Sequence, residues 1–443
     1  MAEAKQASNA WRVVIVLFLA NLFNFFDRAV PAIVAEPLRR EFNLTDFQIG
    51  LMAGAFTIVY AIAGIPLGRM ADTGSRKTIM GWGLIVWSVL TAAGAGAWNF
   101  VSFLATRVGV GIGEASFAPA ANSMIGDLFP ASKRSRATGV FMLGLPLGLV
   151  LAFFTVGAMV RAFDSWRAPF VIAMIPGLLI AVAMFMIHEP ERGAAEAVKA
   201  SSKPIAKPIR KVLTIPTMWW ITLTGIAANF ASYATNSFMV PLMQRYFGLA
   251  LEPAAIATGV IVGITGLIGL LAGGWLADRA HQRSERGRLL LGAAMLALSA
   301  LLTWFALTRF DNLAVTAFIV VFALGWLLHY FYYTCLYPAI QDVVEPRLRA
   351  TAVAVFFAAL YLLGAAFGPM VMGWLSDVYS TAAMVAEGVT EKSEAHRAVG
   401  LHGSFILVPI SLAVAAVTMF LASRTFPADA RRMTEDMRMA AGD

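Results

Sequence analysis

Four ionisable residues occur deep within long apolar stretches, where a charge is costly. Asp27 and Arg28 lie in an apolar run from about 11 to 35, and Arg107 and Glu114 lie in a later one. A charged side chain at the centre of a membrane costs roughly 2.5–3.5 kcal/mol even on the lenient insertion scales. Two carboxylates and two guanidinium groups at such a depth are suited to binding a proton and an anion.

The spacing of these residues predicts how their side chains meet. Asn24 is three residues before Asp27 and four before Arg28, so all three share one helical face. Arg107 and Glu114 are two helical turns apart, which puts them on one face about 10 Å from each other. If the two faces meet, the four charges form one buried network. The amide of Asn24 would belong to this network together with Arg107 and the other three charged residues.

Two interpretations of this network remain open. It could be a static ion-pair cluster, but buried pairs are weak evidence for stability. It could instead bind a proton, because low dielectric disfavours an ionised carboxylate whereas a neighbouring arginine favours it. We favour Glu114 as the proton carrier, since Arg28 adjoins Asp27 in sequence and would hold it ionised; Asp27 is the alternative. Arg28, and after it Arg107, would bind an anionic head group with its planar fork.

Composition assigns the helices that carry these residues to a membrane protein. The chain has 443 residues, is 59% hydrophobic and only 14% charged, and has a mean hydropathy of +0.73. Continuous apolar runs of about 20 residues predict spanning helices rather than strands. The fold class is therefore an all-α membrane protein with twelve transmembrane helices. The expected spans are 11–35, 46–70, 78–97, 99–126, 136–160, 167–187, 217–245, 253–277, 288–308, 312–340, 350–375 and 400–422.

The distribution of positive charge predicts the orientation in the membrane. With the N-terminus inside, 24 of the 34 Lys and Arg residues fall on the cytoplasmic side and eight on the outer side. This bias places both termini in the cytoplasm of a multi-pass cell (inner) membrane protein. The net charge of +8 is thus a topology signal and implies no nucleic-acid partner. The first apolar run is too long and too charged for a cleavable signal peptide. The single Cys335 excludes a disulfide framework or cysteine metal cluster.

Two halves of the chain repeat each other. Gly68 to Asp72 resembles Gly274 to Asp278, and Asp127 recurs as Asp342. An internal duplication predicts two pseudo-symmetric six-helix bundles around a central site that opens alternately to each side. The expected domains are an N-terminal bundle (1–187), a polar cytoplasmic linker (188–216), a C-terminal bundle (217–426) and a cytoplasmic tail (427–443).

The second half offers uncharged groups where the first offers charges. Polar residues recur at helical spacing in the seventh predicted span, and aromatic residues are dense in the tenth and eleventh. Such residues are more often core than ligand-binding, and a lone His is more often a packing residue. We nevertheless expect some of them to line the cavity, and a cavity with one charged and one aromatic wall suits an amphiphile. The candidates are Asn229, Tyr233, Asn236, His329, Tyr330, Tyr333, Tyr337, Phe357 and Tyr361.

Glycine pairs four residues apart are expected to be helix-packing surfaces. The pairs are Gly50 and Gly54, Gly64 and Gly68, Gly109 and Gly113, and Gly144 and Gly148. Gly109, Gly111 and Gly113 do not form a phosphate loop, since no Gly-Lys-Ser/Thr follows them. An ATP-driven pump is not supported.

Several motifs resemble a known family of transporters. Gly68-x-x-x-Asp72-x-Gly74-x-Arg76-Lys77 is similar to the loop signature of the major facilitator superfamily, and the stretch from Arg107 to Gly113 resembles its fourth-helix motif. Asn24-Phe25-Phe26-Asp27-Arg28 and the stretch from Gly111 to Phe117 resemble the Spinster family of lipid transporters. The resemblance implies a cytoplasmic gate that latches the two halves and breaks during transport. Its residues would be Gly68, Asp72, Gly74, Arg76 and Lys77, with Asp278 and Arg279 as the weaker second copy.

The resemblance implies a secondary active transporter that works by alternating access. Its substrate would be an anionic amphiphile such as a lysophospholipid or a sphingoid phosphate, coupled to protons and needing no other cofactor. A proton-coupled organic anion or drug carrier is the alternative. A lipid-modifying membrane enzyme is a third possibility, but the five histidines are scattered, with no metal spacing and no Ser-His-acid grouping in the sequence. The expected partners are the bilayer and the small amphiphile, and the expected state is a monomer.

Overall fold

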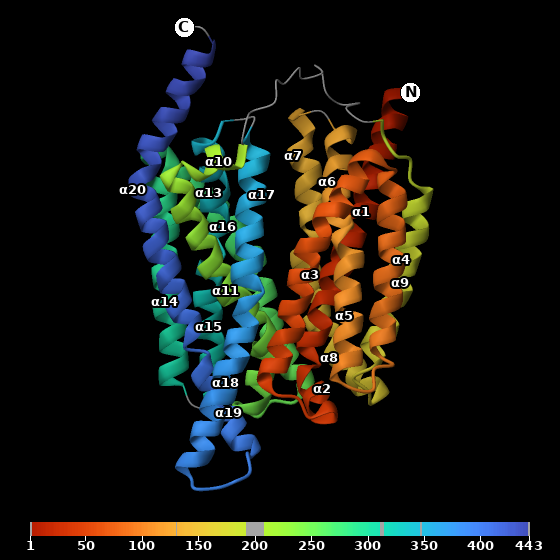
Figure 1. The fold of residues 1–443 in the computed structure, drawn as a ribbon, viewed down its shortest axis with the longest axis vertical. Helices are drawn as coiled ribbons and strands as arrows, with labels where there is room; N and C mark the ends of the chain where they lie inside the picture. The colour runs from red at the N-terminus through yellow and green to blue at the C-terminus, as the bar shows by residue number, and fades with distance from the viewer. Residues whose placement is uncertain (1, 130, 192–207, 311–313, 346–347, 442–443) are drawn as a thin grey trace. The chain divides into compact units, whose positions relative to one another are not determined.

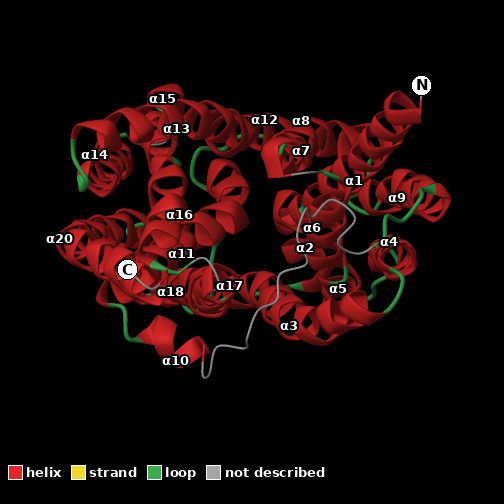
Figure 2. Ribbon diagram, turned by 90° about the horizontal axis from the view of Figure 1, so that it is seen from above, coloured by secondary structure: helices red, strands yellow, loops and turns green. Residues whose placement is uncertain are grey.

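The computed structural model is helical throughout the part that it describes, which comprises residues 2–129, 131–191, 208–310, 314–345 and 348–441. Within these ranges there are no strands, and loops join successive helices (Figure 2). Nine helical stretches in them are long and apolar enough to cross a membrane. The remaining expected spans, near 78–97, 99–126 and 217–245, are helical too. Most of the predicted linker lies outside the described residues.

The chain divides into two compact units. Unit 1 comprises residues 1–44, 55–203 and 251–259, and unit 2 comprises 45–54, 204–250 and 260–443. The helices of unit 1 (Figure 1) are α1 (Ala2–Ile33), α2 (Ala35–Phe42), most of α3 (Asp46–Thr73), α4 (Arg76–Gly94), α5 (Phe100–Ala115), α6 (Phe117–Leu128), α7 (Ala131–Met142), α8 (Gly144–Phe163), α9 (Ala168–Met186) and α12 (Leu251–Thr258).

Unit 2 contains the remaining helices and two short π-helical segments. They are α10 (Pro208–Leu213), α11 (Pro216–Arg245), the π-helix η1 (Gly259–Ile264), α13 (Thr265–Arg283), α14 (Gly287–Arg309), α15 (Val315–His329), α16 (Phe331–Val343), α17 (Arg349–Ala359), the π-helix η3 (Leu360–Ala365), α18 (Phe367–Ala386), α19 (Glu394–Ser404) and α20 (Leu407–Ala441). The residues expected to form a tail from 427 onward continue α20 as a helix, in the part that is described.

Local sequence signals set where several helices begin and end. Ser75 caps α4 by accepting the backbone N–H of Thr78, which satisfies a donor that has no partner within the helix. Asn99 and Ser102 form a reciprocal capping box at the start of α5. Asn43 ends α2 in the left-handed conformation, which Asn tolerates better than most residues. These capping residues mark helix ends that the apolar runs alone do not show.

The fourth span of each half is broken at one residue. In unit 1 the break at Ser116 separates α5 from α6, and in unit 2 the break at Tyr330 separates α15 from α16. The π-helices η1 and η3 interrupt the eighth and eleventh spans in a similar way. Such local departures from α-helix geometry are frequent at functional sites.

Matching ion pairs support the internal duplication. In unit 1 Arg76 is fully buried and binds Asp127 at the end of α6. In unit 2 Arg288 Nη1 donates to Asp342 Oδ2 at 2.9 Å, at the end of α16. The two halves therefore repeat a structural contact as well as a sequence.

The first turn of α3 packs within unit 2, although the rest of that helix belongs to unit 1. The buried carboxylate of Asp46 accepts two bonds from Arg245 Nη1, at 2.8 and 2.9 Å, and one from Ser376 Oγ at 2.6 Å. Asp377 in turn accepts the backbone N–H groups of Asp46 and Phe47 at the start of the helix. Polar groups from α11 and α18 thus replace the solvent at this helix end.

A surface ion pair in unit 1 gives a pH-dependent stability. Arg167 Nη2 and Nη1 donate to the carboxylate of Glu41 at 2.6 and 2.8 Å, and Trp166 Nε1 donates at 2.5 Å. The hydrogen bonds from Arg167 are the main reason that the pKa of Glu41 lies below its ordinary value of 4.5. Because the folded pKa is the lower one, this contribution to stability is present above the ordinary value and is lost as pH falls through the folded pKa.

We therefore expect Glu41→Gln to lower the thermal stability of the purified protein at pH 7. The loss should correspond to about 1 kcal/mol or less, because exposed pairs contribute little. The difference in unfolding temperature between the variant and the unchanged protein should narrow as the pH falls below the ordinary value of 4.5. The exposed Glu391→Gln serves as the control. A difference that stays constant from pH 7 down to the lowest pH at which the protein remains folded would contradict the assignment.

Candidate functional site

The four deep charges of unit 1 do lie together. Arg28 Nε, on α1, donates to Glu114 Oε2, on α5, at 2.6 Å, and the Glu114 side chain is fully buried. Asp27 interacts electrostatically with both Glu114 and Arg107. The expected meeting of two helix faces is therefore present within this unit.

The partner of Arg28 differs from the one expected. The sequence suggested that Arg28 holds Asp27 ionised, but Arg28 pairs with Glu114 instead. Adjacent residues of a helix point about 100° apart around its axis, so Asp27 and Arg28 do not face each other. Among the described residues Asp27 has no ion-pair partner within 4 Å, and its Oδ1 atom is buried without a hydrogen bond. The argument for favouring Glu114 over Asp27 as the proton carrier therefore no longer holds.

Other atoms of the cluster also lack hydrogen bonds. They include Glu114 Oε1, and Arg107 Nε and Nη2, all in side chains with little exposure. A buried polar atom without a partner costs about 1–3 kcal/mol. Several such atoms together are uncommon in a buried cluster that serves structure alone. This cluster retains hydrogen-bonding capacity for a proton, a water molecule or a ligand.

Aromatic rings surround the Arg28 guanidinium. Its central carbon lies 4.4 Å from the ring centroid of Tyr60, 5.0 Å from that of Phe25 and 5.2 Å from that of Phe56. These distances are within the range of cation–π attraction. The rings orient the guanidinium while 15% of the Arg28 side chain stays accessible. Phe56 and Tyr60 were missed in the sequence; their four-residue spacing on α3 was the available signal.

Arg107 occupies a more enclosed position. It is only 3% exposed, and its guanidinium lies about 5.5 Å from the rings of Phe103 and Phe170. Its charge acts on the two acids of the cluster, Asp27 and Glu114. Of the two candidates for anion binding, Arg28 is thus the more accessible one.

Close helix packing holds α1 and α5 in place. Gly148 lies against the backbone carbonyl of Leu22, and a Cβ at Gly144 would come within 2.9 Å of Leu22 N. On the other side, a Cβ at Gly113 would come within 3.0 Å of Trp87 N in α4. Asn21 adds a hydrogen bond to the carbonyl of Phe141 at 3.0 Å, next to the break between α7 and α8.

The expected glycine-packing surfaces are present except for one. Gly50 and Gly54 lie against the backbone of α18, and Gly109 lies against Leu90. Gly64, in contrast, has no atom within 4 Å of an added Cβ, and Gly68 meets only Pro119 at 3.8 Å. The prediction for Gly64 and Gly68 was wrong for this structure, because this part of α3 is largely exposed.

The two basic residues of the gate motif hydrogen-bond to the chain segment that follows α9. Arg76 Nε donates to Glu189 Oε1 at 3.1 Å, Arg76 Nη2 donates to the carbonyl of Pro190 at 2.7 Å, and Lys77 Nζ donates to that of Ile187. These contacts tie the start of α4 to the chain that leaves α9. The side chain of Asp72 lies outside the described residues.

The remaining gate-motif residues lie near helix ends. A Cβ at Gly74 would come within 3.1 Å of the Met70 carbonyl. In unit 2, Asp278 is mostly exposed and lies 3.9 Å from Arg288, while Arg279 covers the ring of Trp275.

The candidate cavity residues of unit 2 form a connected aromatic and polar cluster. Tyr333 stacks on Tyr337, and Phe357 stacks on Tyr361. Tyr337 joins the two pairs, with its ring 5.9 Å from that of Phe357. Tyr233 meets Tyr361 edge to face.

The polar members of this cluster hydrogen-bond to one another or to the backbone. Asn229 Nδ2 donates to Tyr332 Oη at 3.0 Å, and Ser232 Oγ lies 2.7 Å from His329 Nε2. Tyr330 donates to the carbonyl of Val262, in η1. Asn236 Oδ1 is buried without a hydrogen bond.

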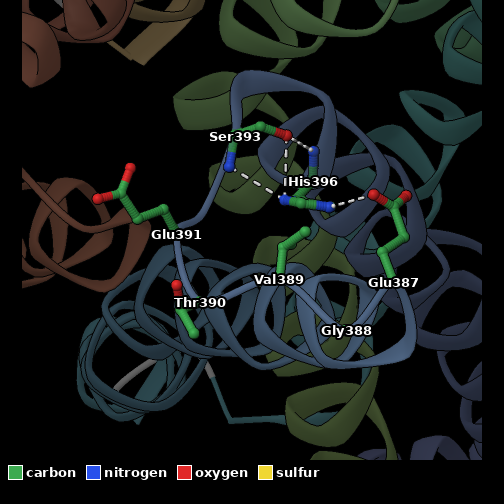
Figure 3. Close-up of a pocket in the computed structure, with 7 residues that line it drawn as sticks. All are labelled: Glu387, Gly388, Val389, Thr390, Glu391, Ser393 and His396. Carbon is green, nitrogen blue, oxygen red and sulfur yellow. Dashed lines mark hydrogen bonds and ion pairs between the residues drawn. The ribbon is translucent and has the colours of Figure 1, made fainter.

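A Ser-His-acid grouping that the sequence did not reveal lies near the start of α19 (Figure 3). His396 Nε2 lies 2.9 Å from Glu387 Oε2, and His396 Nδ1 lies 3.0 Å from Ser393 Oγ. However, Nδ1 also accepts the backbone N–H of Ser393 at 3.0 Å, and Ser393 Oγ accepts that of His396. The group is a helix capping box, so its imidazole is not free to activate the serine.

Comparisons with known proteins test the fold and the family of the chain. The model of the Major Facilitator Superfamily matches residues 17–369. A hexuronate transporter of Bacillus subtilis is 30% identical, with 85% of this chain and 91% of that protein covered. A sphingosine-1-phosphate transporter of Xenopus tropicalis is 26% identical, with 95% and 83% covered. The crystal structure of a bacterial homologue of the human lysosomal transporter Spinster is 29% identical over 95% of this chain and 98% of that chain, with a TM-score of 0.85. The expected twelve-span all-α fold and the resemblance to Spinster proteins are confirmed.

Proposed function

The chain belongs to the Major Facilitator Superfamily, and on this basis we propose that it moves an anionic amphiphile across the membrane by proton-coupled alternating access. It is a multi-pass membrane transporter that resembles the Spinster and sphingosine-1-phosphate transporters as well as a bacterial hexuronate transporter. The proposed substrate is a lysophospholipid or sphingoid phosphate. No cofactor other than the proton is proposed.

The observation that best supports this proposal is the set of contacts that Arg28 makes. Its Nε atom is paired with Glu114 while aromatic rings orient the guanidinium and part of the side chain remains accessible. A phosphate or carboxylate is the acceptor that best matches an arginine fork. An incoming anion would compete with Glu114 for the same guanidinium. Substrate binding and the charge on Glu114 are then linked.

The proton is proposed to bind within the same cluster. A carboxylate that is buried without a paired cation favours its neutral form. In the structure Asp27 is such a carboxylate. Glu114 would become one when an anion replaces it as the partner of Arg28. We therefore propose Asp27 as the first proton site and Glu114 as the second, with Asn24 and Arg107 completing the charge network.

The aromatic cluster of unit 2 is proposed to take the apolar part of the substrate. Tyr333, Tyr337, Phe357 and Tyr361 offer a continuous surface of rings. Rings bind acyl chains through their large apolar area. A small sugar acid has no need of such a surface, which is why we place a lipid-like anion ahead of an organic anion.

The runner-up is a proton-coupled carrier of organic anions, and it has its own support. The hexuronate transporter of Bacillus subtilis is as similar as the Spinster proteins are, and the Arg28 fork would also bind a carboxylate. A lipid-modifying enzyme ranks below both, since the one Ser-His-acid grouping found among the described residues serves as a helix cap.

We further propose a monomer in the cell (inner) membrane with both termini in the cytoplasm, with the gate motif on the cytoplasmic side. The observation that supports the orientation is the surplus of Lys and Arg in the loops assigned to the cytoplasmic side.

Reconstituted protein tests the substrate class directly. Proteoliposomes with an imposed pH gradient are given labelled oleoyl lysophosphatidate or labelled glucuronate, and albumin then extracts lipid left in the outer leaflet. We expect protected lysophosphatidate to exceed that of protein-free liposomes, with a smaller signal for glucuronate. Transport of glucuronate alone would establish the runner-up. Release of fatty acid or glycerophosphate would establish an enzyme.

A further inference from the structure

His329 has an unused hydrogen-bonding atom in the interior of unit 2. The residue is fully buried, its Nε2 atom lies 2.7 Å from Ser232 Oγ, and its Nδ1 atom has no hydrogen-bond partner. The imidazole stacks on Trp326 with ring centroids 4.7 Å apart. A buried polar atom without a partner is costly unless something binds it.

The internal repeat gives His329 a counterpart in the charged cluster. Glu114 precedes Asp127 by thirteen residues, and His329 precedes Asp342 by thirteen. Glu114 lies just before the helix break at Ser116, and His329 lies directly before the break at Tyr330. The two residues therefore occupy equivalent places in the fourth span of their halves.

The partners of these two residues match as well. Asn24 and Asp27 are three residues apart in the first span, and Asn229 and Ser232 are three apart in the seventh. Asp27 interacts with Glu114, and Ser232 hydrogen-bonds His329. At these positions the second half therefore carries neutral hydrogen-bonding groups where the first half carries charges.

The chemistry of the pair limits what it can bind. The described contacts of His329 comprise Ser232, Trp326 and the rings of Tyr330, Tyr332 and Tyr333, with no charged side chain among them. A neutral imidazole whose Nε2 is held by Ser232 offers its Nδ1 for one hydrogen bond. A hydroxyl group suits this atom in either tautomer, because a hydroxyl can both donate and accept, whereas an anionic oxygen can only accept.

We propose that Asn229, Ser232 and His329 form a second, uncharged subsite, in which His329 Nδ1 binds a hydroxyl group of the substrate. This inference rests on the proposed function, since the hydroxyl group belongs to the kind of substrate proposed there. Lysophospholipids and sphingoid phosphates both carry a free hydroxyl near their phosphate, and hexuronates carry several. A buried hydrogen-bonding group discriminates against an analogue that lacks its partner.

Two probe pairs test the subsite by binding to the purified full-length protein. One pair is oleoyl lysophosphatidate and its 2-deoxy analogue, and the other is glucuronate and its 4-deoxy analogue. We expect the unchanged protein to bind the hydroxylated member of at least one pair about tenfold more tightly, the effect of one net hydrogen bond.

Two substitutions at His329 separate the roles of its nitrogens. His329→Asn places an amide near the position of Nδ1 and should keep most of the tenfold preference. His329→Gln reaches toward Ser232 instead and should bring the preference to about one. A thermal unfolding scan establishes that both variants fold. His402→Gln is the matched control, since His402 also has a buried ring nitrogen without a partner but stacks on Tyr246 at the far end of α11.

The outcomes distinguish this subsite from the proposed function. Equal binding of both members of each pair by the unchanged protein would overturn the subsite and leave the proposed function standing. An equal loss of affinity for both members of a probe pair in His329→Gln would likewise overturn the subsite and leave the proposed function standing. Failure of the unchanged protein to bind any of the four probes would overturn the subsite and the proposed function together.

Discussion

Asp27→Asn is expected to abolish proton coupling while leaving the binding of substrate largely intact. In the structure Asp27 is the acid of the cluster without an ion-pair partner within 4 Å among the described residues, and its Oδ1 atom is buried without a hydrogen bond. Asparagine has nearly the same shape but cannot gain or lose a proton. The variant should therefore resemble the protonated state of the unchanged protein at every pH.

The size of this effect follows from thermodynamics. If one proton moves with one monovalent anion, each unit of pH gradient supports up to about tenfold accumulation, because 1.4 kcal/mol is a factor of ten. In Asp27→Asn the accumulation ratio should fall to about one. A pH-sensitive dye trapped in proteoliposomes should report substrate-induced proton movement for the unchanged protein and none for the variant. Exchange of labelled for unlabelled substrate should persist in both.

Matched variants decide which acid carries the proton. Asp27→Glu keeps a carboxylate and should retain part of the coupling. Glu252→Gln changes an acid of α12 whose partner is the exposed Arg161, so it should leave the dye signal unaltered. If Asp27→Asn keeps its coupling and Glu114→Gln loses it, Glu114 is the carrier, as the sequence alone had suggested.

The membership of the charged cluster could be predicted from sequence, but its pairing could not. The cost of a charge at membrane depth identified Asp27, Arg28, Arg107 and Glu114 without any structure. The choice between Asp27 and Glu114 as the partner of Arg28 depends on helix rotation and on packing against α5, 86 residues away. Adjacency in sequence was a poor guide, because neighbours on a helix point in different directions.

The environment of the cluster was predicted even less well. Phe56 and Tyr60 have the spacing of one helical face, but so do aromatic residues that face lipid, and nothing in the sequence tells the two apart. Gly64 and Gly68 have the spacing of a packing motif without the packing. The Ser393 and His396 capping box was visible in the sequence only as residues three apart. For the aromatic and glycine positions, the missing information was which other helix lies opposite.

Arg28→Ala is expected to weaken the binding of anionic amphiphiles about 10- to 100-fold. A hydrogen bond to a charged group contributes about 1.5–3 kcal/mol, and a factor of ten corresponds to 1.4 kcal/mol. Binding of a neutral amphiphile with the same acyl chain should change much less, because it makes no use of the guanidinium. The measurement is a binding titration of purified protein with oleoyl lysophosphatidate and with monooleoylglycerol.

Conservative variants separate charge from geometry at this position. Arg28→Lys keeps the positive charge but loses the planar fork and its fit among the rings of Phe25, Phe56 and Tyr60. We expect it to recover only part of the lost affinity. Arg107→Lys is the matched control, since Arg107 is almost fully buried between Phe103 and Phe170; it should reduce affinity for both amphiphiles to a similar and smaller extent.

The comparison of the two amphiphiles decides the role of Arg28. If Arg28→Ala weakens both equally, the residue supports the fold around Glu114 and does not bind the head group. If the loss is confined to the anion, Arg28 releases Glu114 when it binds substrate, and the proton held by Asp27 must then pass to that carboxylate, which would otherwise be an unpaired charge in the interior. Anion binding by Arg28→Ala should accordingly lose its dependence on pH as well as its strength. The same titration repeated between pH 6 and pH 8 would therefore show whether anion binding at Arg28 is coupled to proton binding.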